Sequence, residues 1–419
     1  MAKEPQLRID LTHAAIEHTS LLRHSVRLQW ALRELDEDAD VGFMDLPGRR
    51  DLLREIDSFG GARRGRFDDI VQFGTGGSSL GGQALCQALL PPRHNDFAPK
   101  GTPRYHFADN IDPDSLGALL DYVDPVRTLF HVVSKSGGTL ETAAQLHVVR
   151  EFFKGRRGFR PERNFVATTG EKGILRDFAS EEGIPTLTFP ENVGGRFSVF
   201  TASGLLVPAL CGVPVRRILS GARRVNPLCH GDAMGGPAGR LAALFYEHDQ
   251  SGQRPIHVDL IYGDALVTVG AWFAQLWAES LGKKSKGPTP VVARGTTDQH
   301  SQLQLYAEGP DDKVYTVIRV QRFADRLKVA RGALPPEISG RQLADVFQAG
   351  ADGTAEALAA QGRPVVRIEV PRITPEVVGE LLYLRQLQTV LAGALYRVNP
   401  FDQPGVEAGK QAARNILAG

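Results

Sequence analysis

The sequence predicts an α/β protein built from two parallel sheets, each flanked by helices in a three-layer arrangement. Apolar, strand-like runs alternate with helical patterns in both halves of the chain, a pattern typical of parallel sheets covered by helices. With 419 residues, the chain is long enough for two domains with separate hydrophobic cores. Glycine-rich turns follow two of the expected strands, as in α/β folds that bind ligands at strand ends.

In the first half, the expected strands are short apolar runs bounded by turn residues. They lie at 68–73, 105–107, 128–133, 164–168 and 185–189. Helical patterns cover 83–90 and 140–153, and a helix over 197–210 is expected to close this half. Residues 1–60 are polar and predict a helical N-terminal segment, and residues 61–211 form the first expected domain.

Prolines and a Gly-Gly pair mark residues 212–240, part of which is expected to be helical, as the connection between the two domains. The second domain is expected over 241–419 and ends in a C-terminal helix. Its strands are predicted at 256–262, 290–293, 313–320 and 364–370. Its helices are predicted at 265–281, 341–361 and 374–395.

Composition excludes several classes of protein. A net charge of +1 gives no support for a nucleic-acid surface or a polybasic membrane anchor. The three cysteines, Cys86, Cys211 and Cys229, form no Cys-x-x-Cys pair and predict neither a disulfide framework nor a zinc site. We find no apolar run long enough for a membrane span, and the charged start of the chain does not resemble a signal peptide. These observations predict a cytoplasmic protein.

Two turns could bind an anion. In SKSGGT (134–139), glycines allow close approach of the backbone, Ser134, Ser136 and Thr139 offer hydroxyl groups, and Lys135 offers charge at the start of a helix. GTGGSS (74–79) is a similar turn, with Ser78 and Ser79 as donors. The competing interpretation is an ordinary helix start capped by glycine and serine. Neither turn has the order of a Walker loop, and the second lacks the third glycine of a dinucleotide fingerprint.

Three further segments supply groups for proton transfer. ENVGGR (191–196) ends in Arg196, and the helical run AES (278–280) contains Glu279. GTTDQH (295–300) ends in His300, which is expected in the first turn of a helix. NPFDQPGVEAGK (399–410) ends in Lys410, which is expected to close a loop before the last helix. A glutamate at an apolar helix end suits a general base, and an arginine beside bare glycine backbone suits an anionic ligand.

Each of these residues also has a structural interpretation. Glu279 could pair with Lys283 at the surface, Arg196 could pair with Glu191, and Lys410 could be a solvated charge. The set is nevertheless what aldose–ketose isomerisation requires: a base that moves a proton between adjacent carbons, a group that stabilises an anion, and groups that open a sugar ring. No cluster of histidines or carboxylates with metal-ligand spacing accompanies these segments, so we expect no metal and no cofactor.

Together these segments resemble the glucose-6-phosphate isomerase (phosphoglucose isomerase) family, in its shorter bacterial type. The matching stretches are FGTGGSSLGG, SKSGGTLET, ENVGGRFSVFTASGLL, AES..GK, GTTDQHSQLQLYAEGPDDK and NPFDQPGVEAGK, in family order across 73–410. The resemblance implies two sugar-isomerase (SIS) domains. It also implies interconversion of glucose 6-phosphate and fructose 6-phosphate through a cis-enediol(ate), in glycolysis and gluconeogenesis.

The resemblance also assigns roles. Glu279 corresponds to the base, Arg196 to the group that stabilises the enediolate, and His300 and Lys410 to the ring-opening pair. The family's histidine comes from the partner subunit, so the resemblance implies a homodimer with His300 supplied across the interface. Residues that match the family's substrate and phosphate contacts are Gly77, Ser78, Ser134, Lys135, Ser136, Thr139, Gln275 and Gln403.

The chain departs from the family pattern at two positions. Gly138 stands where many members have threonine, so one hydroxyl contact to phosphate is expected to be missing. Asp298 stands where other branches have glycine. Three alternatives stay open: an isomerase that also accepts mannose 6-phosphate, a phosphosugar-binding regulator, and a structural or interaction protein, which would leave the glutamate, arginine, histidine and lysine of these segments without a role. The regulator would be expected to carry a basic DNA-binding helix, which residues 1–60 do not show.

Overall fold

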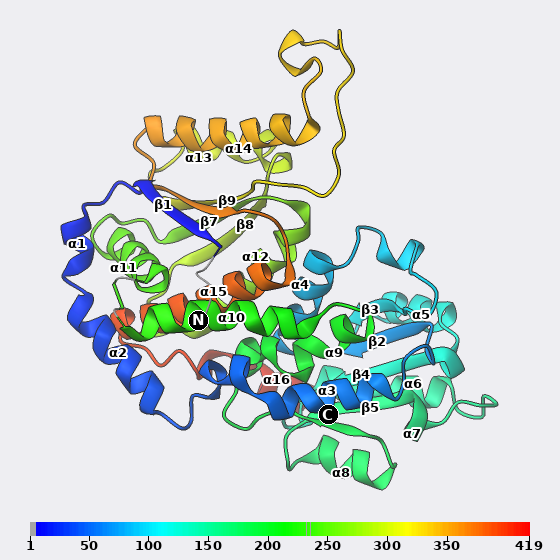
Figure 1. Ribbon diagram of the computed structural model, residues 1–419. Coiled ribbons are helices and arrows are strands. Elements are labelled where there is room, and N and C mark those ends of the chain that lie inside the picture. The colour runs from blue at the N-terminus through cyan, green and yellow to red at the C-terminus, as the bar shows by residue number, and fades with distance from the viewer. Residues whose placement is uncertain (1–5, 232, 235) are drawn as a thin grey trace. The chain divides into compact units, whose positions relative to one another are not determined.

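The structure, a computed structural model, describes residues 6–231, 233–234 and 236–419. The chain forms two compact units (Figure 1). The first unit takes in Asp38–Arg223 and Ile373–Glu380. The second takes in Arg224–Arg372 and Leu381–Gly419, together with the described residues before Asp38.

The first unit contains a five-stranded parallel sheet with the strand order β3-β2-β4-β5-β6. Its strands are β2 (Asp69–Phe73), β3 (Arg104–Ala108), β4 (Thr128–Val133), β5 (Phe165–Thr169) and β6 (Thr186–Thr188). The order reverses between β2 and β4, because β3 lies on one side of this pair and β5 and β6 lie on the other. Such a switch point places the turns after both strands at the same edge of the sheet.

Helices cover both faces of this sheet. On one face, alternate strand residues such as Phe73 and Phe130 pack against apolar side chains of α5 (Pro113–Tyr122), α6 (Leu140–Phe152) and α8 (Ile174–Glu181). On the other face, Gln72 contacts α9 (Ala202–Leu210). The other helices of this unit are α3 (Arg50–Gly61), α4 (Leu80–Leu89) and α7 (Pro161–Asn164).

The second unit contains a five-stranded sheet with the order β1-β10-β9-β7-β8. Its strands are β1 (Arg8–His13), β7 (Ile256–Tyr262), β8 (Thr289–Arg294), β9 (Lys313–Val320) and β10 (Val365–Val370). All neighbours are parallel except the edge strand β1, which pairs antiparallel with β10. An antiparallel edge on an otherwise parallel sheet is common in α/β folds.

One face of the second sheet packs against α13 (Leu303–Glu308) and α14 (Leu343–Ala360). The opposite face contacts α11 (Pro237–Gln250) through Phe245, and α15 (Pro375–Tyr396) through Arg385. The remaining helices are α1 (His18–Leu22), α2 (Ser25–Glu37), α10 (Val215–Gly231), α12 (Val267–Leu281) and α16 (Glu407–Leu417). Between β9 and α14, the chain extends away from the sheet in a long excursion (Figure 1).

A buried ion pair lies between the second sheet and its helices. The guanidinium of Arg385 donates to both carboxylate oxygens of Asp259 at 3.1 and 3.0 Å and stacks 4.1 Å from the ring centroid of Phe273 on α12. Arg385 is 1% exposed and Asp259 is 6% exposed. Burial raises the pKa of Asp259, and the charge of Arg385 opposes that change. The pair therefore connects β7, α12 and α15.

The predicted two-sheet α/β fold is confirmed, with two corrections. Residues 1–60 are not wholly helical, because β1 joins the second sheet. The helix expected over 197–210 is a 3₁₀ segment, η6 (Gly195–Phe200), followed by α9, with Thr201 as N-cap. Residues 212–240, which were expected to connect the domains and to be helical in part, contain α10 and the start of α11.

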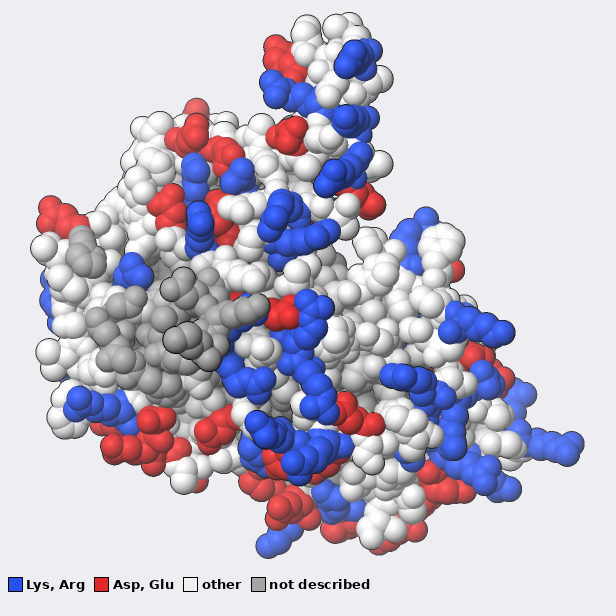
Figure 2. All heavy atoms as spheres, in the orientation of Figure 1, with Lys and Arg blue, Asp and Glu red and all other residues white. Residues whose placement is uncertain are grey.

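Two features of the surface and helices bear on the classes considered above. Positive and negative residues both occur across the face drawn in Figure 2. Among the helices of the described part of the chain, none combines the length and apolar character that a membrane crossing requires. Cys86 and Cys211 are buried free thiols, and the side chain of Cys229 lies outside the described residues.

Candidate active site

The first glycine-rich turn lies at the end of β2 and contains the 3₁₀ segment η3 (Gly76–Ser78). Gly77 packs against the backbone of Gly195 and Arg196, so closely that a Cβ atom at Gly77 would overlap both residues. The hydroxyl of Ser198 donates to the carbonyl oxygens of Gly195 at 2.7 Å and of Gly77 at 3.3 Å. The fold thus brings two of the predicted segments, GTGGSS and ENVGGR, into direct contact.

Gly77→Ala is expected to lower the free energy of unfolding by about 1–3 kcal/mol, because the methyl group would force the turn away from η6. Thermal or urea unfolding measures this loss. Gly117→Ala on α5 is the control, because a Cβ atom there meets nothing within 4 Å. In that helix, alanine is expected to stabilise by about 0.5–1 kcal/mol. Equal stability of the two variants would contradict the packing argument.

The second turn, SKSGGT, lies between β4 and α6 at the same sheet edge. The hydroxyl of Ser134 accepts from the Gly137 amide at 3.1 Å and donates to the Thr139 hydroxyl at 3.4 Å. Gly137 has φ +74°, a left-handed conformation that favours glycine. The Ser136 hydroxyl accepts from the Gly138 amide at 3.2 Å. Ser134 is buried, Lys135 and Thr139 are half-buried, and Ser136 is exposed.

Lys135 joins this turn to the arginine segment. Its Nζ donates to the carbonyl oxygens of Glu191 and of Val193, the latter at 3.4 Å. Arg196, five residues after Glu191, is 3% exposed and lies in η6. The predicted residues of the first unit therefore belong to a single neighbourhood: both glycine-rich turns contact the segment that contains Arg196.

In the second unit, Glu279 lies in the last turn of α12 and is half-buried. Its Oε1 accepts from Nε2 of Gln275 at 2.9 Å, so two of the predicted residues are in contact. The Oε1 atom of Gln275 is buried and has no protein partner. A buried acceptor of this kind is usually satisfied by water or by a ligand.

Lys283, which we did not assign to the site, connects α12 to the segment that contains Gln403. Its Nζ donates to the carbonyl oxygens of Ser280 at 2.9 Å and of Asn399, and pairs with the Asp402 carboxylate at 2.9 Å. Lys283 therefore connects the C-terminal end of α12, the helix that contains Glu279, to the NPFDQ turn. The signal for it in the sequence was weak: a lysine in a loop that contains two others.

His300 is the last residue of the 3₁₀ segment η8 (Thr297–His300) and is exposed, rather than lying in the first turn of a helix as expected. Asp298 explains the local shape. Its carboxylate accepts from the Arg294 amide at 2.6 Å and from the Ser301 hydroxyl at 2.7 Å. These hydrogen bonds lower the pKa of Asp298. The departure from the family pattern at this position thus has a structural role on both sides of the turn.

Lys410 lies inside α16, not in the loop before it, and is exposed. Its Nζ pairs with Oε1 of Glu407, one turn earlier, at 2.8 Å. Gln403 is half-buried and precedes the 3₁₀ segment η10 (Pro404–Val406). This ion pair of Lys410 is local, so the predicted role of Lys410 rests on the sequence.

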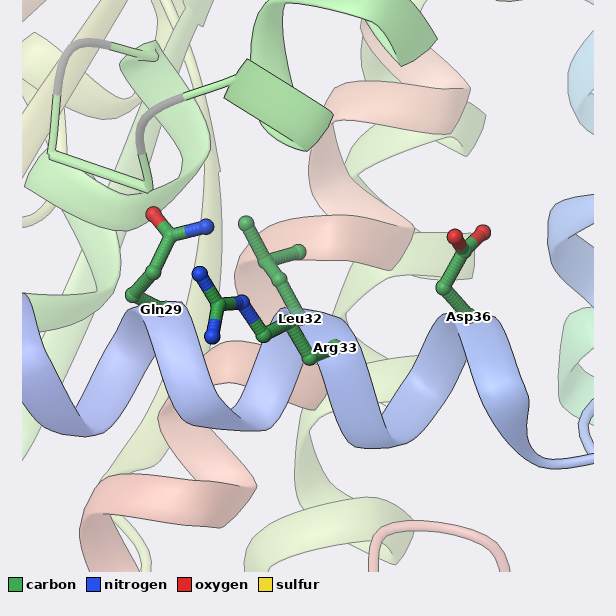
Figure 3. Close-up of a pocket in the computed structure, with 4 residues that line it drawn as sticks. All are labelled: Gln29, Leu32, Arg33 and Asp36. Carbon is green, nitrogen blue, oxygen red and sulfur yellow. The ribbon is translucent and has the colours of Figure 1, made fainter.

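A separate hollow of about 240 Å³ lies along α2 and contains none of the predicted site residues. Figure 3 shows Gln29, Leu32, Arg33 and Asp36 at this hollow. Gln29 accepts from the Ala233 amide at 3.0 Å. Within the described residues, no group of three or more histidines, cysteines or carboxylates is placed to hold a metal ion.

One parallel sheet and one largely parallel sheet, both flanked by helices, with hydroxyl-rich glycine turns at a switch point of the first, define an α/β protein of the class that binds anionic ligands at strand ends. Comparison with known proteins makes this class specific. A family model described as phosphoglucose isomerase matches residues 48–310 and 339–419. The chain therefore belongs to the phosphoglucose isomerase family.

Individual relatives agree. A glucose-6-phosphate isomerase of Rubrobacter xylanophilus is 43% identical over 397 residues, which cover 92% of this chain and 91% of the relative. One of Thermus thermophilus is 36% identical over 427 residues, which cover 99% and 100% of the two chains. The crystal structure of a glucose-6-phosphate isomerase of Chlamydia trachomatis superposes with a TM-score of 0.88 at 22% identity, covering 98% and 88%, and supports the fold.

Proposed function

We propose that this protein interconverts D-glucose 6-phosphate and D-fructose 6-phosphate, an aldose–ketose isomerisation that serves glycolysis and gluconeogenesis. The observation that carries the proposal is membership of the phosphoglucose isomerase family over most of the chain. The arrangement of the first unit supports it, because two anion-binding turns contact the arginine segment. We also propose that the reaction takes place in the cytoplasm and needs neither a metal nor a redox cofactor.

In this proposal, the substrate phosphate binds at the two glycine-rich turns. Its ligands are backbone amides and hydroxyl groups at the starts of helices, where the helix dipole favours an anion. The residues that we assign to this role are Gly77, Ser78, Ser134, Lys135, Ser136 and Thr139. Gln275 and Gln403 line the sugar-binding part of the site. The Oε1 atom of Gln275, which has no protein partner, would accept a hydrogen bond from a sugar hydroxyl.

The proposed chemistry begins with ring opening by His300 and Lys410. Glu279 then removes the proton from C2 of the open aldose, and the electrons form a cis-enediolate between C1 and C2. The buried guanidinium of Arg196 stabilises the negative oxygen that develops. A proton then moves from the C2 hydroxyl to the C1 oxygen, and Glu279 returns the carbon-bound proton to C1, which gives the ketose with its carbonyl at C2 and a hydroxyl at C1. One carboxylate thus serves as both base and acid, and the contact with Gln275 fixes its orientation.

Proton NMR of fructose 6-phosphate incubated with the protein in D2O and EDTA tests the function. We expect glucose 6-phosphate that carries deuterium at C2, because the proton on Glu279 exchanges with solvent while the enediolate exists. Mannose 6-phosphate beside it would change the proposal to a dual-specificity isomerase. Absence of any product would exclude the proposed reaction in this metal-free form.

We further propose that the active form is a homodimer in which His300 is supplied across the interface. Its exposed position on η8 is compatible with such a role. Glu279→Gln and His300→Ala chains are expected to be inactive alone and to recover activity when they are coexpressed with different tags and purified as mixed dimers. Each mixed dimer would have one site with an intact Glu279 and an intact partner histidine.

The expected activity of such mixed dimers is about half that of the native dimer, because one of two sites is intact. Mixed dimers that stay inactive would place His300 in the same subunit as its Glu279. Full activity of the His300→Ala homodimer would exclude any catalytic role for this histidine.

A further inference from the structure

Three polar side chains form a row beneath the first glycine-rich turn, on the α9 face of the parallel sheet. Gln72 on β2 and His131 on β4 are register partners, so their side chains leave the sheet on the same face. Thr168 lies two residues beyond Val166, the partner of His131 on β5, and shares that face. Gln72, His131 and Thr168 are each 0% exposed.

The row is continuously hydrogen-bonded. Nε2 of Gln72 donates to the carbonyl oxygen of Ser78 at 2.8 Å and to that of Ser203 at 3.1 Å. Oε1 of Gln72 is 3.0 Å from Nδ1 of His131, and Nε2 of His131 is 2.7 Å from the hydroxyl of Thr168. One end of the row therefore lies at the turn that contains Ser78, one of the proposed phosphate ligands. The other end lies at Thr168 on β5.

The chemistry of the groups fixes the direction of every hydrogen bond. Two carbonyl oxygens can only accept, so the amide nitrogen of Gln72 must face them and its oxygen must face His131. Nδ1 of His131 must then carry a proton. Burial lowers the pKa of His131 to about 3, so the ring is neutral and its Nε2 has no proton. The Thr168 hydroxyl must therefore donate to Nε2.

We propose that Gln72, His131 and Thr168 are positioning residues that hold the Ser78 turn in its phosphate-binding shape. The inference rests on the proposed function for the identity of the ligand. By binding the carbonyl oxygens of Ser78 and Ser203 with a single NH2 group, Gln72 ties the turn to α9. His131 and Thr168 keep that NH2 group facing the turn, because the reversed amide would place two oxygens against each other.

The carbonyl oxygens of Ser78 and Ser203 select this arrangement, because they can only accept hydrogen bonds. The Thr168 hydroxyl can donate or accept, and in this arrangement it donates to Nε2 of His131. Without the hydroxyl, Nε2 of His131 would be a buried acceptor with no donor, so the ring of His131 and the amide of Gln72 would be held less firmly. The backbone carbonyl of Thr168 also accepts from the Ser134 amide of the SKSGGT turn at 3.1 Å, and a substitution of the side chain leaves that hydrogen bond in place.

Nitrogen-15 NMR of the full-length protein with labelled histidine tests the deduced proton positions. The expected result for His131 is a neutral ring with its proton on Nδ1 at every pH from about 5 to 8, identified by loss of the signal in His131→Asn. A proton on Nε2, or a charged ring in this range, would overturn the inference. This readout does not depend on the enzymatic reaction.

The second test uses Thr168→Val, which keeps the side-chain shape and removes the hydroxyl. We expect its inhibition constant for inorganic phosphate and its KM for fructose 6-phosphate to rise by roughly fivefold, with kcat within about twofold of the native value. Thr168→Ser, which keeps the hydroxyl, is expected to restore native values. In Thr168→Val, the nitrogen-15 shift of Nε2 of His131 is expected to change because Nε2 loses its hydrogen-bond donor, while the proton stays on Nδ1.

Thr128→Val is the matched control, because Thr128 is also 0% exposed and its hydroxyl also makes one hydrogen bond, to the Asp124 carbonyl at 2.7 Å. It lies at the opposite end of β4 and should leave phosphate inhibition unchanged. Equal inhibition constants for phosphate in Thr168→Val and Thr128→Val would show that the row has no specific role in phosphate binding. If the native protein does not turn over fructose 6-phosphate but His131 has the deduced tautomer, the proposed function is wrong. The deduced hydrogen bonds of the row would still be correct.

Discussion

Glu279→Gln is expected to lower kcat by about a thousandfold or more while KM changes little, because the amide retains the shape of the side chain and cannot take up a proton. The hydrogen bond from Gln275 to Oε1 of Glu279 can be kept in the variant, so the helix end has no reason to rearrange. Steady-state kinetics and deuterium incorporation at C2 should fall together. A loss of turnover with full deuterium exchange would place Glu279 in ring opening rather than in proton transfer.

The chain offers a closely matched control for this variant. Nε2 of Gln304 donates to Oε2 of Glu308 at 2.7 Å, so this pair has the same residue types and the same four-residue spacing as Gln275 and Glu279. Glu308 is exposed at the end of α13. Glu308→Gln is therefore expected to leave kcat and KM at native values. A comparable loss in this variant would show that the effect at Glu279 is not chemical.

Asp259→Ala is expected to have the largest effect on stability, a loss of about 3–5 kcal/mol in the free energy of unfolding. The variant leaves the guanidinium of Arg385, which is 1% exposed, without its carboxylate partner between β7 and α12. Desolvation of an unpaired charge is expensive, and no solvent can reach the group in the folded protein. Urea unfolding followed by tryptophan fluorescence measures the change, since Trp272 and Trp277 lie on α12.

Two further variants separate the charge from the packing. Removing both charges in Asp259→Leu with Arg385→Met should recover most of the lost stability, because a buried ion pair is often replaceable by apolar groups. Glu151→Ala breaks the Lys154–Glu151 pair, whose side chains are 73% and 74% exposed, and should change stability by less than about 1 kcal/mol. A double variant as unstable as Asp259→Ala would mean that shape, not charge, dominates at this position.

The sequence predicts the strands of this fold well where they are buried on both faces. The strands β4, β7 and β9 begin and end where the apolar runs do, because an interior parallel strand needs apolar residues on both sides and stops at turn residues. The edge strand β1 was not predicted. Its pairing with β10 is formed by residues from opposite ends of the chain, and a short alternating run such as RIDLTH contains no information about that partner.

Part of the site follows from the same logic. Turns after neighbouring parallel strands must meet at one edge, so the proximity of SKSGGT to GTGGSS could be expected once β2 and β4 were recognised as strands. The roles of Lys283 and Gln72 could not be predicted from the sequence. Each depends on carbonyl groups supplied by remote backbone, of Asn399 in one case and of Ser203 in the other. The type of a side chain determines whether it can donate or accept hydrogen bonds. Only the tertiary structure determines which groups are its partners.

The pairing of β1 with β10 also constrains the order in which the protein can fold during synthesis. The strands of the first sheet all lie within Asp69–Thr188, so that sheet can assemble while the remainder of the chain is still being translated. The residues of β1 leave the ribosome before those of every other strand and must wait for Val365–Val370, the last strand to emerge. During that interval the residues of β1 cannot form their sheet pairing, so completion of the second sheet has to follow synthesis of nearly the whole of Arg8–Val370.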